Sequence, residues 1–533
     1  MSDVVDMEPE ETLIPLGAAF DNIDSMRRGG RDVFGDGPRL TDSGNAERWV
    51  NHHGGSGFRF HKERSAWLRW DDRRWADDDG QALLSTKDVA RSYLVDAVGA
   101  ASKHERDLLA RHADKSESAS SRAAMLKLAA AEPTITVVAA DLDKDPWLFC
   151  CSNGTLDLRT GLLQSHRRSD LLTKIAPVPF IDDAVAPRFE KFLAEIMPDV
   201  EVRTFLQRFF GYCLTGVIRE HVLPIFWGAT SRNGKGTLVE TLLAILGPYA
   251  CPIPADLLME KNGEAHPTEK AQLHQLRFAV ASESKQQKRL DEDVIKNLTG
   301  QDSIRARFMH KDFFSFEPTH KLALQTNYKP VIRGGDPAVW ARLRLVPFEV
   351  SFLGREDVTL REKLKLELPG ILRWLVDGCL AWQREGLGTA GKIEEATAEY
   401  RSKSDNIAAF LEECCVVAES ARVQSKVLYD AYRIWTEARG GRPQSINGWA
   451  ESLEQKGWSS KKSDGRMLFR GLGLLHETER QGGREAQGVP AKFPLLEGNC
   501  GSNFTGSPSV SLPPSFARFE LGTPDPDDFS GDR

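Results

Sequence analysis

An apolar run, a glycine-rich loop and a helical stretch follow one another directly, and they constrain the fold more than any other segment. The run is Val222–Trp227, the loop is Gly228–Thr237, and residues 238–246 carry leucines at helical spacing. This order predicts a strand, a loop whose backbone N–H groups face an anion, and a helix whose positive end points at the same anion. The segment therefore predicts an α/β layer architecture with a nucleotide phosphate site at the loop.

The predicted phosphate site comprises the whole loop, in which Lys235 would neutralise phosphate charge. Its residues are Gly228, Ala229, Thr230, Ser231, Arg232, Asn233, Gly234, Lys235, Gly236 and Thr237. Five residues rather than four separate Gly228 from Gly234, and Gly236 stands where a Ser or Thr normally follows the lysine. Thr237 is therefore the predicted metal ligand. An ordinary glycine-rich loop is the alternative interpretation.

Length and composition indicate a multidomain globular protein. The 533 residues are too many for one core, so two to four domains are expected. No apolar stretch approaches a membrane span, and the first residues lack the pattern of a signal peptide, which predicts a cytosolic protein without a membrane partner. The eight cysteines form no Cys-x-x-Cys pair, which favours reduced thiols over a zinc site.

Composition and periodicity divide the chain into seven segments. These are a disordered N-terminus (1–40), a small aromatic-rich unit (41–95), a helical and hairpin domain (96–215), an ATPase domain (216–365), a helical connector (366–404), a winged-helix-like domain (405–475) and a disordered tail (476–533).

Two further apolar runs end in polar residues suited to nucleotide hydrolysis. Leu276–Glu283 reads as a strand ending in a carboxylate, which would activate water and take part in metal binding. Lys321–Asn327 reads as a strand ending in an amide, which would orient that water or the γ-phosphate. Many such motors carry two adjacent acids, but Ser282 precedes Glu283 here. A charged strand end and a turn-forming Asn are the alternatives.

Arginines follow at Arg342 and Arg344, on a segment that leads into another predicted strand. An arginine in this place would reach the nucleotide of a neighbouring subunit and stabilise transition-state charge. A surface arginine is the alternative.

A predicted hairpin between the acid and the amide is locally basic. Arg305, Arg307 and Lys311 alternate with apolar positions, and His310-Lys311-Asp312 reads as the tip. A basic tip on a motor core suits a phosphate backbone that passes along it, so these residues and His310 are predicted to bind DNA. A solvated hairpin is the alternative.

The C-terminal unit is also basic. Residues 421–475 contain ten Lys and Arg against five Asp and Glu, and they read as helix, turn, helix and basic hairpin. This order is typical of a winged helix, with the second helix suited to a major groove and Lys461, Lys462 and Arg466 in the hairpin. A role in protein contact is the alternative.

The ordered set of motifs resembles the superfamily 3 helicases, and within them the helicase part of phage, plasmid and poxvirus-type primase-helicases. The motifs are Arg232–Thr237, Ala281–Glu283, Leu298–Asp302, Thr326-Asn327 and Trp340–Arg342 before Val346–Phe348. Residues 41–48 and 152–161 look like the segments that precede the motor in that family. The resemblance spans roughly residues 41–475.

The resemblance implies an AAA+-like P-loop ATPase core that uses ATP and Mg²⁺. It implies a ring, expected to be a hexamer, that hydrolyses ATP between subunits and pulls one DNA strand through its channel. Lys235 would bind phosphates, Glu283 would activate water and Asn327 would sense the nucleotide. Arg342 would be the arginine finger, with Arg344 as the second candidate, and His310-Lys311 would contact DNA.

Primer synthesis is not expected, because only about 90 residues precede the helical region and Asp71-Asp72 lacks spaced carboxylate and His partners. A separate primase would then be a partner. The expected function is an ATP-dependent DNA helicase of phage or plasmid replication. The alternative is a non-enzymatic DNA-binding initiator or loading platform whose degenerate nucleotide site serves only assembly. A small-molecule kinase ranks last, because it leaves the basic hairpin and the C-terminal unit unexplained.

Overall fold

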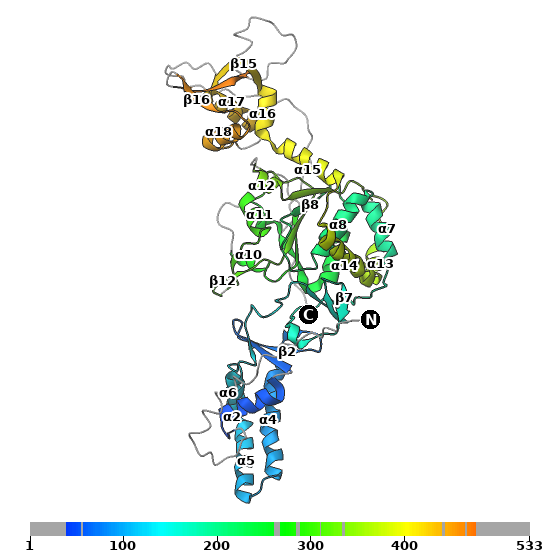
Figure 1. Ribbon diagram of the computed structural model, residues 1–533, viewed down its shortest axis with the longest axis vertical. Helices are drawn as coiled ribbons and strands as arrows, with labels where there is room; N and C mark the ends of the chain where they lie inside the picture. The colour runs from blue at the N-terminus through cyan, green and yellow to red at the C-terminus, as the bar shows by residue number, and fades with distance from the viewer. Residues whose placement is uncertain are drawn as a thin grey trace, which may run out of the picture. The chain divides into compact units, whose positions relative to one another are not determined.

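The computed structural model (Figure 1) describes residues 39–54, 57–260, 267–283, 288–309, 311–332, 336–439, 443–463 and 466–475. The side chains of Pro267, Glu283 and Gln455 lie outside this description, and so do both ends that the sequence predicts to be disordered, apart from residues 39 and 40. Three parts of the chain have hydrophobic cores of their own, and each is described by itself.

The first part packs helices against a small sheet with strand order β3-β2-β1-β4. Its elements are α2 (Asp42–Trp49), β1 (Phe58–His61), β2 (Ala66–Trp70), β3 (Trp75–Asp77), α4 (Gln81–Val98), α5 (Lys103–Ser116), α6 (Ala119–Ala129) and β4 (Thr136–Val137). Trp49 and Trp75 are fully buried, whereas Trp67 and Trp70 are half-buried. The aromatic run therefore contributes to the core of this part.

The central part opens with an antiparallel sheet and two helices. Their bounds are β5 (Leu148–Cys151), β6 (Gly154–Asp157), β7 (Leu162–Gln164), α7 (Pro187–Ile196) and α8 (Val200–Tyr212). Pro187 starts α7 at a position where its missing N–H leaves no helical hydrogen bond unmade. Asp199 starts α8 by accepting a 3.1 Å hydrogen bond from the N–H of Val202.

A five-stranded parallel sheet forms the middle of the central part, with strand order β14-β8-β13-β10-β9. Its elements, with the hairpin β11–β12, are β8 (Leu223–Trp227), α9 (Lys235–Leu246), β9 (Ala250–Pro254), α10 (Pro267–Ala271), β10 (Phe278–Glu283), α11 (Glu292–Leu298), β11 (Ile304–Arg307), β12 (Phe313–Phe316), β13 (Lys321–Thr326), α12 (Pro337–Trp340) and β14 (Leu343–Pro347). The strand and the helix that the sequence predicts on either side of the glycine-rich loop are β8 and α9.

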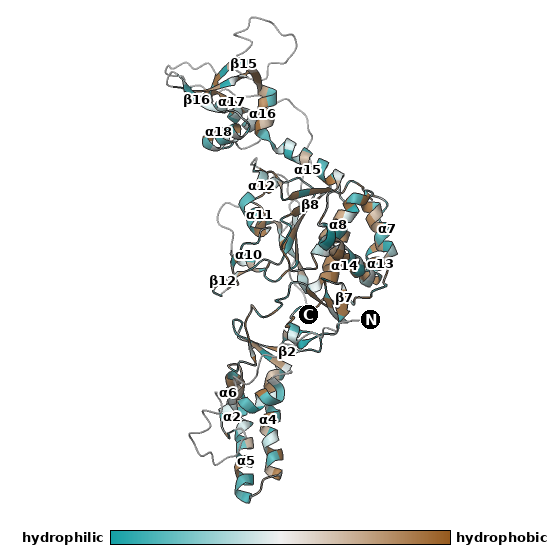
Figure 2. Ribbon diagram, in the orientation of Figure 1, coloured by the Kyte–Doolittle hydropathy of each residue, from teal (hydrophilic) through white to brown (hydrophobic). Residues whose placement is uncertain are grey.

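Both faces of this sheet are buried, which explains why its strands read as continuous apolar runs. Phe226 and Val280 belong to one core cluster, and their neighbours Ile225 and Ala279 belong to another. Figure 2 shows β8 in the hydrophobic colour.

Three helices complete the central part, namely α13 (Leu360–Leu366), α14 (Leu368–Glu385) and α15 (Gly391–Ser404). α14 crosses α8 at a contact between glycines. A Cβ on Gly378 would lie 2.1 Å from the carbonyl oxygen of Gln207, and one on Gly211 would lie 2.2 Å from the backbone N of Cys379. The two backbones therefore touch with no room for a side chain.

The third part has three helices and a three-stranded antiparallel sheet of order β15-β17-β16. Its elements are α16 (Asn406–Cys414), β15 (Cys415–Gln424), α17 (Ser425–Ala438), α18 (Ile446–Gln455), β16 (Ser460–Ser463) and β17 (Arg466–Leu474). Its core gathers aromatic side chains around the fully buried Trp449.

Among the described residues, no helix combines the length and the apolar character that crossing a lipid bilayer requires.

The glycine contact generates a stability prediction. Gly378→Ala should lower the free energy of unfolding by about 1–3 kcal/mol, because the added methyl group must displace the backbone of α8. Gly391→Ala is the control, since a Cβ there lies 3.8 Å from Glu201 Oε2. Chemical denaturation of both variants measures the difference. Equal effects of the two substitutions would contradict the close crossing.

Candidate functional site

The glycine-rich loop leaves the carboxyl end of β8 and enters α9 through Gly234. This residue has φ +83°, in the left-handed region, and a Cβ on it would lie 2.4 Å from Ile196 Cγ2. Glycine is required here for both conformation and space. α9 consequently begins at Lys235, and its first backbone N–H groups lie where the loop ends.

Gly228, at the start of the loop, is enclosed by the groups that hold the loop together. A Cβ on it would lie 2.2 Å from Asn233 Nδ2 and 2.6 Å from the carbonyl oxygen of Phe348. Asn233 is buried and donates to the carbonyl oxygen of Thr230 at 2.7 Å and to that of Phe348 at 3.4 Å. The loop is thus tied to itself and to the segment that follows β14.

Lys235 carries a buried charge whose described partners are uncharged oxygens. It is 3% exposed, and its Nζ donates to Asn327 Oδ1 at 3.0 Å and to the carbonyl oxygen of Gly228 at 3.3 Å. Burial lowers the pKa of Lys235 to about 8. An anion next to Nζ would favour the charged form and offset the cost of burial.

Strand order explains why three residues far apart in the sequence come close. β13 pairs with β8 on one side, where Thr326 lies opposite Trp227, and with β10 on the other, where Thr326 lies opposite Glu283. The strands are parallel, so their carboxyl ends meet at one edge of the sheet. The backbone of Glu283 therefore lies at the same edge as the loop and Asn327, while its side chain lies outside the described residues.

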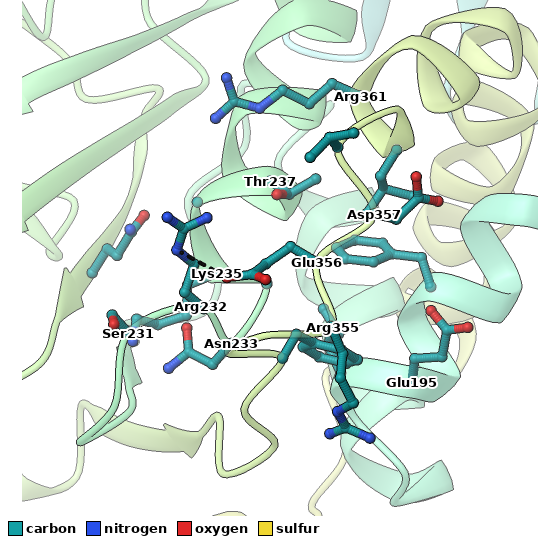
Figure 3. A pocket seen from close by; sticks show the side chains of 18 of the residues that line it. Glu195, Ser231, Arg232, Asn233, Lys235, Thr237, Arg355, Glu356, Asp357 and Arg361 are labelled. Atoms are coloured by element: carbon teal, nitrogen blue, oxygen red, sulfur yellow. Dashed lines mark ion pairs between the residues drawn. The ribbon is translucent and has the colours of Figure 1, made fainter.

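A cavity of about 920 Å³ opens over this edge (Figure 3). It is lined by Arg188, Phe192, Glu195, Ile196, Ser231, Arg232, Asn233, Gly234, Lys235, Gly236, Thr237, Gln325, Asn327, Phe352, Arg355, Glu356, Asp357, Val358, Leu360 and Arg361. The volume is within the range of sites for small molecules and cofactors. Seven of the ten predicted phosphate-site residues line it; Gly228, Ala229 and Thr230 do not.

The sequence interpretation missed the wall formed by α7 and by the segment between β14 and α13. That segment contributes Arg355, Glu356 and Asp357, which are labelled in Figure 3. Arg232 Nε lies 3.5 Å from Glu356 Oε1, which joins the loop to this wall. Hydrogen bonds from Lys363 and Thr359 lower the pKa of Asp357. The charged run 355–357, which follows the buried strand β14 after seven further residues, is the signal in the sequence that points to this wall.

The predicted metal ligands are placed only in part. Thr237 lies in the first turn of α9 and lines the cavity, whereas the side chain of Glu283 lies outside the description. Within the described ranges, no group of three or more His, Cys, Asp or Glu side chains is arranged to hold a metal ion. A hydroxyl with a carboxylate suits Mg²⁺, which usually keeps several waters and the substrate's phosphates as ligands. The metal site therefore stays a prediction.

The two candidate finger arginines lie away from the cavity of their own chain. Arg342 donates to Thr299 Oγ1 at 3.2 Å and to the carbonyl oxygen of Ala338 at 2.7 Å. Arg344 donates to the carbonyl oxygens of Ala341 and Leu343 at 2.8 and 2.9 Å. Both stand at the amino end of β14, at the edge of the sheet opposite to the glycine-rich loop.

The predicted DNA-contacting hairpin is β11–β12. One face of this hairpin carries Arg305 and Arg307, whose guanidinium carbons lie 4.6 and 5.0 Å from the ring centre of Phe313. Lys311 is exposed between the strands, and His310 lies outside the described residues.

The three predicted DNA-binding residues of the C-terminal unit do not share one face. Lys461 lies opposite Leu468 and Lys462 opposite Met467, so the two lysines project from opposite faces of the sheet. Arg466, two residues before Leu468, lies on the face of Lys461.

Known families match three stretches of the chain. A family described as D5 N terminal like matches residues 46–198, and one described as Poxvirus D5 protein-like matches residues 402–468. Between them, residues 226–339 match a family of unknown function. The D5-type matches confirm the resemblance to the superfamily 3 primase-helicases.

Viral proteins are among the relatives. "Putative helicase L207/L206" of Acanthamoeba polyphaga mimivirus is 26% identical over 55% of this chain and 33% of its own length. "Putative helicase 022R" of Frog virus 3 is 26% identical over 56% and 39%. "Putative primase C962R" of African swine fever virus (isolate Pig/Kenya/KEN-50/1950) is 24% identical over 67% and 40%. The chain thus spans about a third to two-fifths of the length of these relatives.

Among solved structures, the apo structure of the NrS-1 C-terminal region is similar at 11% identity and a TM-score of 0.42, covering 78% of this chain and 96% of that one. A likeness of this size carries no argument about the site.

The buried charge of Lys235 generates a pH-dependent prediction. Its folded pKa of about 8 is below the ordinary 10.5, so the cost of burial is fully present below pH 8 and fades as the pH rises toward 10.5. Lys235→Met should therefore stabilise the ligand-free protein at pH 7 by up to about 3 kcal/mol.

That gain should shrink as the pH approaches 10, where the wild-type lysine is largely neutral. Chemical denaturation of both proteins at pH 7 and pH 9.5 measures it. Lys127→Met, at an exposed lysine of α6, is the control and should show no such trend. A variant that is less stable than wild type at pH 7 would contradict the prediction.

Proposed function

Since the chain carries the D5-type domains of the superfamily 3 primase-helicase family, we propose that it is an ATP-dependent DNA helicase or translocase of viral or plasmid replication. The observation that carries the proposal is the buried Lys235 ammonium, held 3.0 Å from Asn327 at the floor of a cavity where parallel strands end. A buried cation beside a helix N-terminus, in a cavity of this size, suits the phosphates of a nucleotide.

The residues at the cavity divide the steps of hydrolysis among them. Lys235 and the loop N–H groups would bind the phosphates, and Thr237 with Glu283 would hold Mg²⁺, which when bound would supply positive charge against the phosphate oxygens. Glu283 accepts a proton from a water that attacks the γ-phosphorus, and Asn327 orients that water. The bond between the γ-phosphorus and the oxygen that bridges it to the β-phosphate breaks, and ADP and phosphate leave.

Assembly into a ring would supply each nucleotide site with an arginine from the neighbouring subunit. Arg342, at the edge of the sheet opposite to its own nucleotide site, is the proposed finger for the neighbouring subunit, with Arg344 as the second candidate. Breaking the two hydrogen bonds that hold Arg342 in its own chain would free it to reach across. The proposed ring is a hexamer, and no primer synthesis is assigned to this chain.

The hairpin β11–β12 is the proposed contact with the translocating strand. Phe313 is 47% exposed, although it lies under two guanidinium groups. An aromatic face flanked by cations suits single-stranded DNA, whose bases stack while the cations bind phosphates.

A non-enzymatic loading platform is the second candidate, and Gly236 after the lysine together with Ser282 before the single acid favours it. Glu283→Gln separates the two functions. A motor with this substitution should lose at least about 100-fold in ATP hydrolysis while it still binds ATP, because the general base is gone.

Glu317→Gln, at an exposed acid beyond the hairpin, is the matched control and should hydrolyse ATP like wild type. The measurement is phosphate release with and without single-stranded DNA. Background release by wild type itself would reject the motor and favour the platform.

The hairpin generates a second prediction. Phe313→Ala and Arg307→Ala should each leave basal ATP hydrolysis unchanged but raise the concentration of single-stranded DNA needed for half-maximal stimulation about tenfold, because the first cannot stack on a base and the second cannot bind a phosphate. Lys127→Ala is the control. Unchanged stimulation in both hairpin variants would place the strand elsewhere.

A further inference from the structure

The sheet of the C-terminal unit has one face against helices and one face without them. Val423 and Phe469 lie opposite each other, and both are buried in the core with α16, α17 and α18. Because side chains alternate along a strand, the neighbours of these two residues project from the other face, here called the outer face.

Register places four cations on the outer face. Arg422 lies directly opposite Arg470, Lys461 lies opposite Leu468, and Arg466 lies opposite Ser463. All four cationic side chains are exposed. They come from all three strands, so the arrangement exists only once the sheet has formed.

Nothing on the paired part of this face balances the charge. Its other residues are uncharged. They are Gln424, Ser463 and Leu468 and, beyond the stretch where the register of β15 and β17 shifts, Val416 opposite Gly473; Glu419 lies in that stretch. Within the described ranges, no ion pair joins any of the four cations to a carboxylate. Two arginines directly opposite each other repel. The folded sheet therefore carries an unfavourable electrostatic free energy, which a bound anion would lower.

The helix that the sequence predicts for a major groove has the wrong charge. α18 contains no Lys or Arg, and its exposed residues include Asn447, Glu451 and Glu454. Lys456, just after its end, forms an ion pair with Asp405. Laid against DNA, this helix would bring two carboxylates to the phosphates, so the structure argues against that prediction.

We propose that the outer face of the β15-β17-β16 sheet binds the phosphate backbone of duplex DNA through Arg422, Lys461, Arg466 and Arg470. Figure 2 shows β16 in the hydrophilic colour. The described aromatic side chains of the unit's core cluster lie on the helix side, and the outer face offers none on which bases could stack. This composition favours a duplex over a single strand. The surface requires no nucleotide, and it would hold the duplex while the motor acts on one strand.

The test is fluorescence anisotropy of a labelled blunt duplex with the full chain, in the absence of nucleotide and across a series of salt concentrations. Arg422→Gln with Arg470→Gln should weaken binding on the order of tenfold. It should also reduce the slope of log K against log salt by about 1.8, which is about 0.9 for each phosphate that the variant no longer neutralises.

Lys426→Gln with Arg433→Gln is the matched control, because it removes the same charge from exposed residues of α17 in the same unit but not from the outer face. It should leave the slope unchanged. The proposal would be overturned if both double substitutions weakened duplex binding equally. It would also be overturned if Arg422→Gln with Arg470→Gln weakened binding only to a single-stranded probe.

Both variants should keep the basal ATP hydrolysis of wild type. The control should keep its thermal stability, and the double arginine variant should be at least as stable, because it removes the repulsion between Arg422 and Arg470. The binding assay contains no ATP, so a protein that fails to hydrolyse ATP would reject the proposed motor and leave this result standing. Conversely, unchanged duplex binding would reject the outer face and leave the motor standing.

Discussion

The contact between Lys235 and Asn327 is the interaction around which the central part is arranged. It places a charge in a buried position with only uncharged oxygens as described partners, at a distance of 3.0 Å from the side-chain amide of the residue that follows β13. Burying this charge costs free energy in the ligand-free protein, and the lowered pKa of Lys235 reflects that cost. The proposed anion at the amino end of α9 would offset this cost.

The parallel sheet is what makes the contact possible. β8 delivers the loop, β13 delivers Asn327 and β10 delivers the backbone of Glu283 to one edge, because parallel strands end together. The loop is hydrogen-bonded to Phe348, and α8 and α14, which belong to the core against one face of the sheet, meet at glycines. Rigid elements under a site keep donors within the short range over which hydrogen bonds act.

In the C-terminal unit the proposed site is an exposed, charged sheet surface and not a buried cation. Its helices and its sheet close an aromatic core, and four cations stand on the sheet face that the core leaves free. Local charge along the chain is a poor guide to this result, because Lys461 and Lys462 are neighbours in sequence yet project from opposite faces. The distinction matters for recognition, since a phosphate backbone responds to where cations stand in space.

The sequence by itself determined the elements and the order of the polar groups at their ends. Apolar runs followed by Gly228, Glu283 and Asn327 predict strands and their ends, because burial on both faces and glycine chemistry are local properties. Only the tertiary structure decided which ends meet. Strand order joins Lys235 to Asn327, the return of the chain after β14 brings the charged segment 355–357 to the cavity, and register gathers Arg422 with Arg470. Each of these depends on pairing between distant segments, for which the local pattern of residues carries no information.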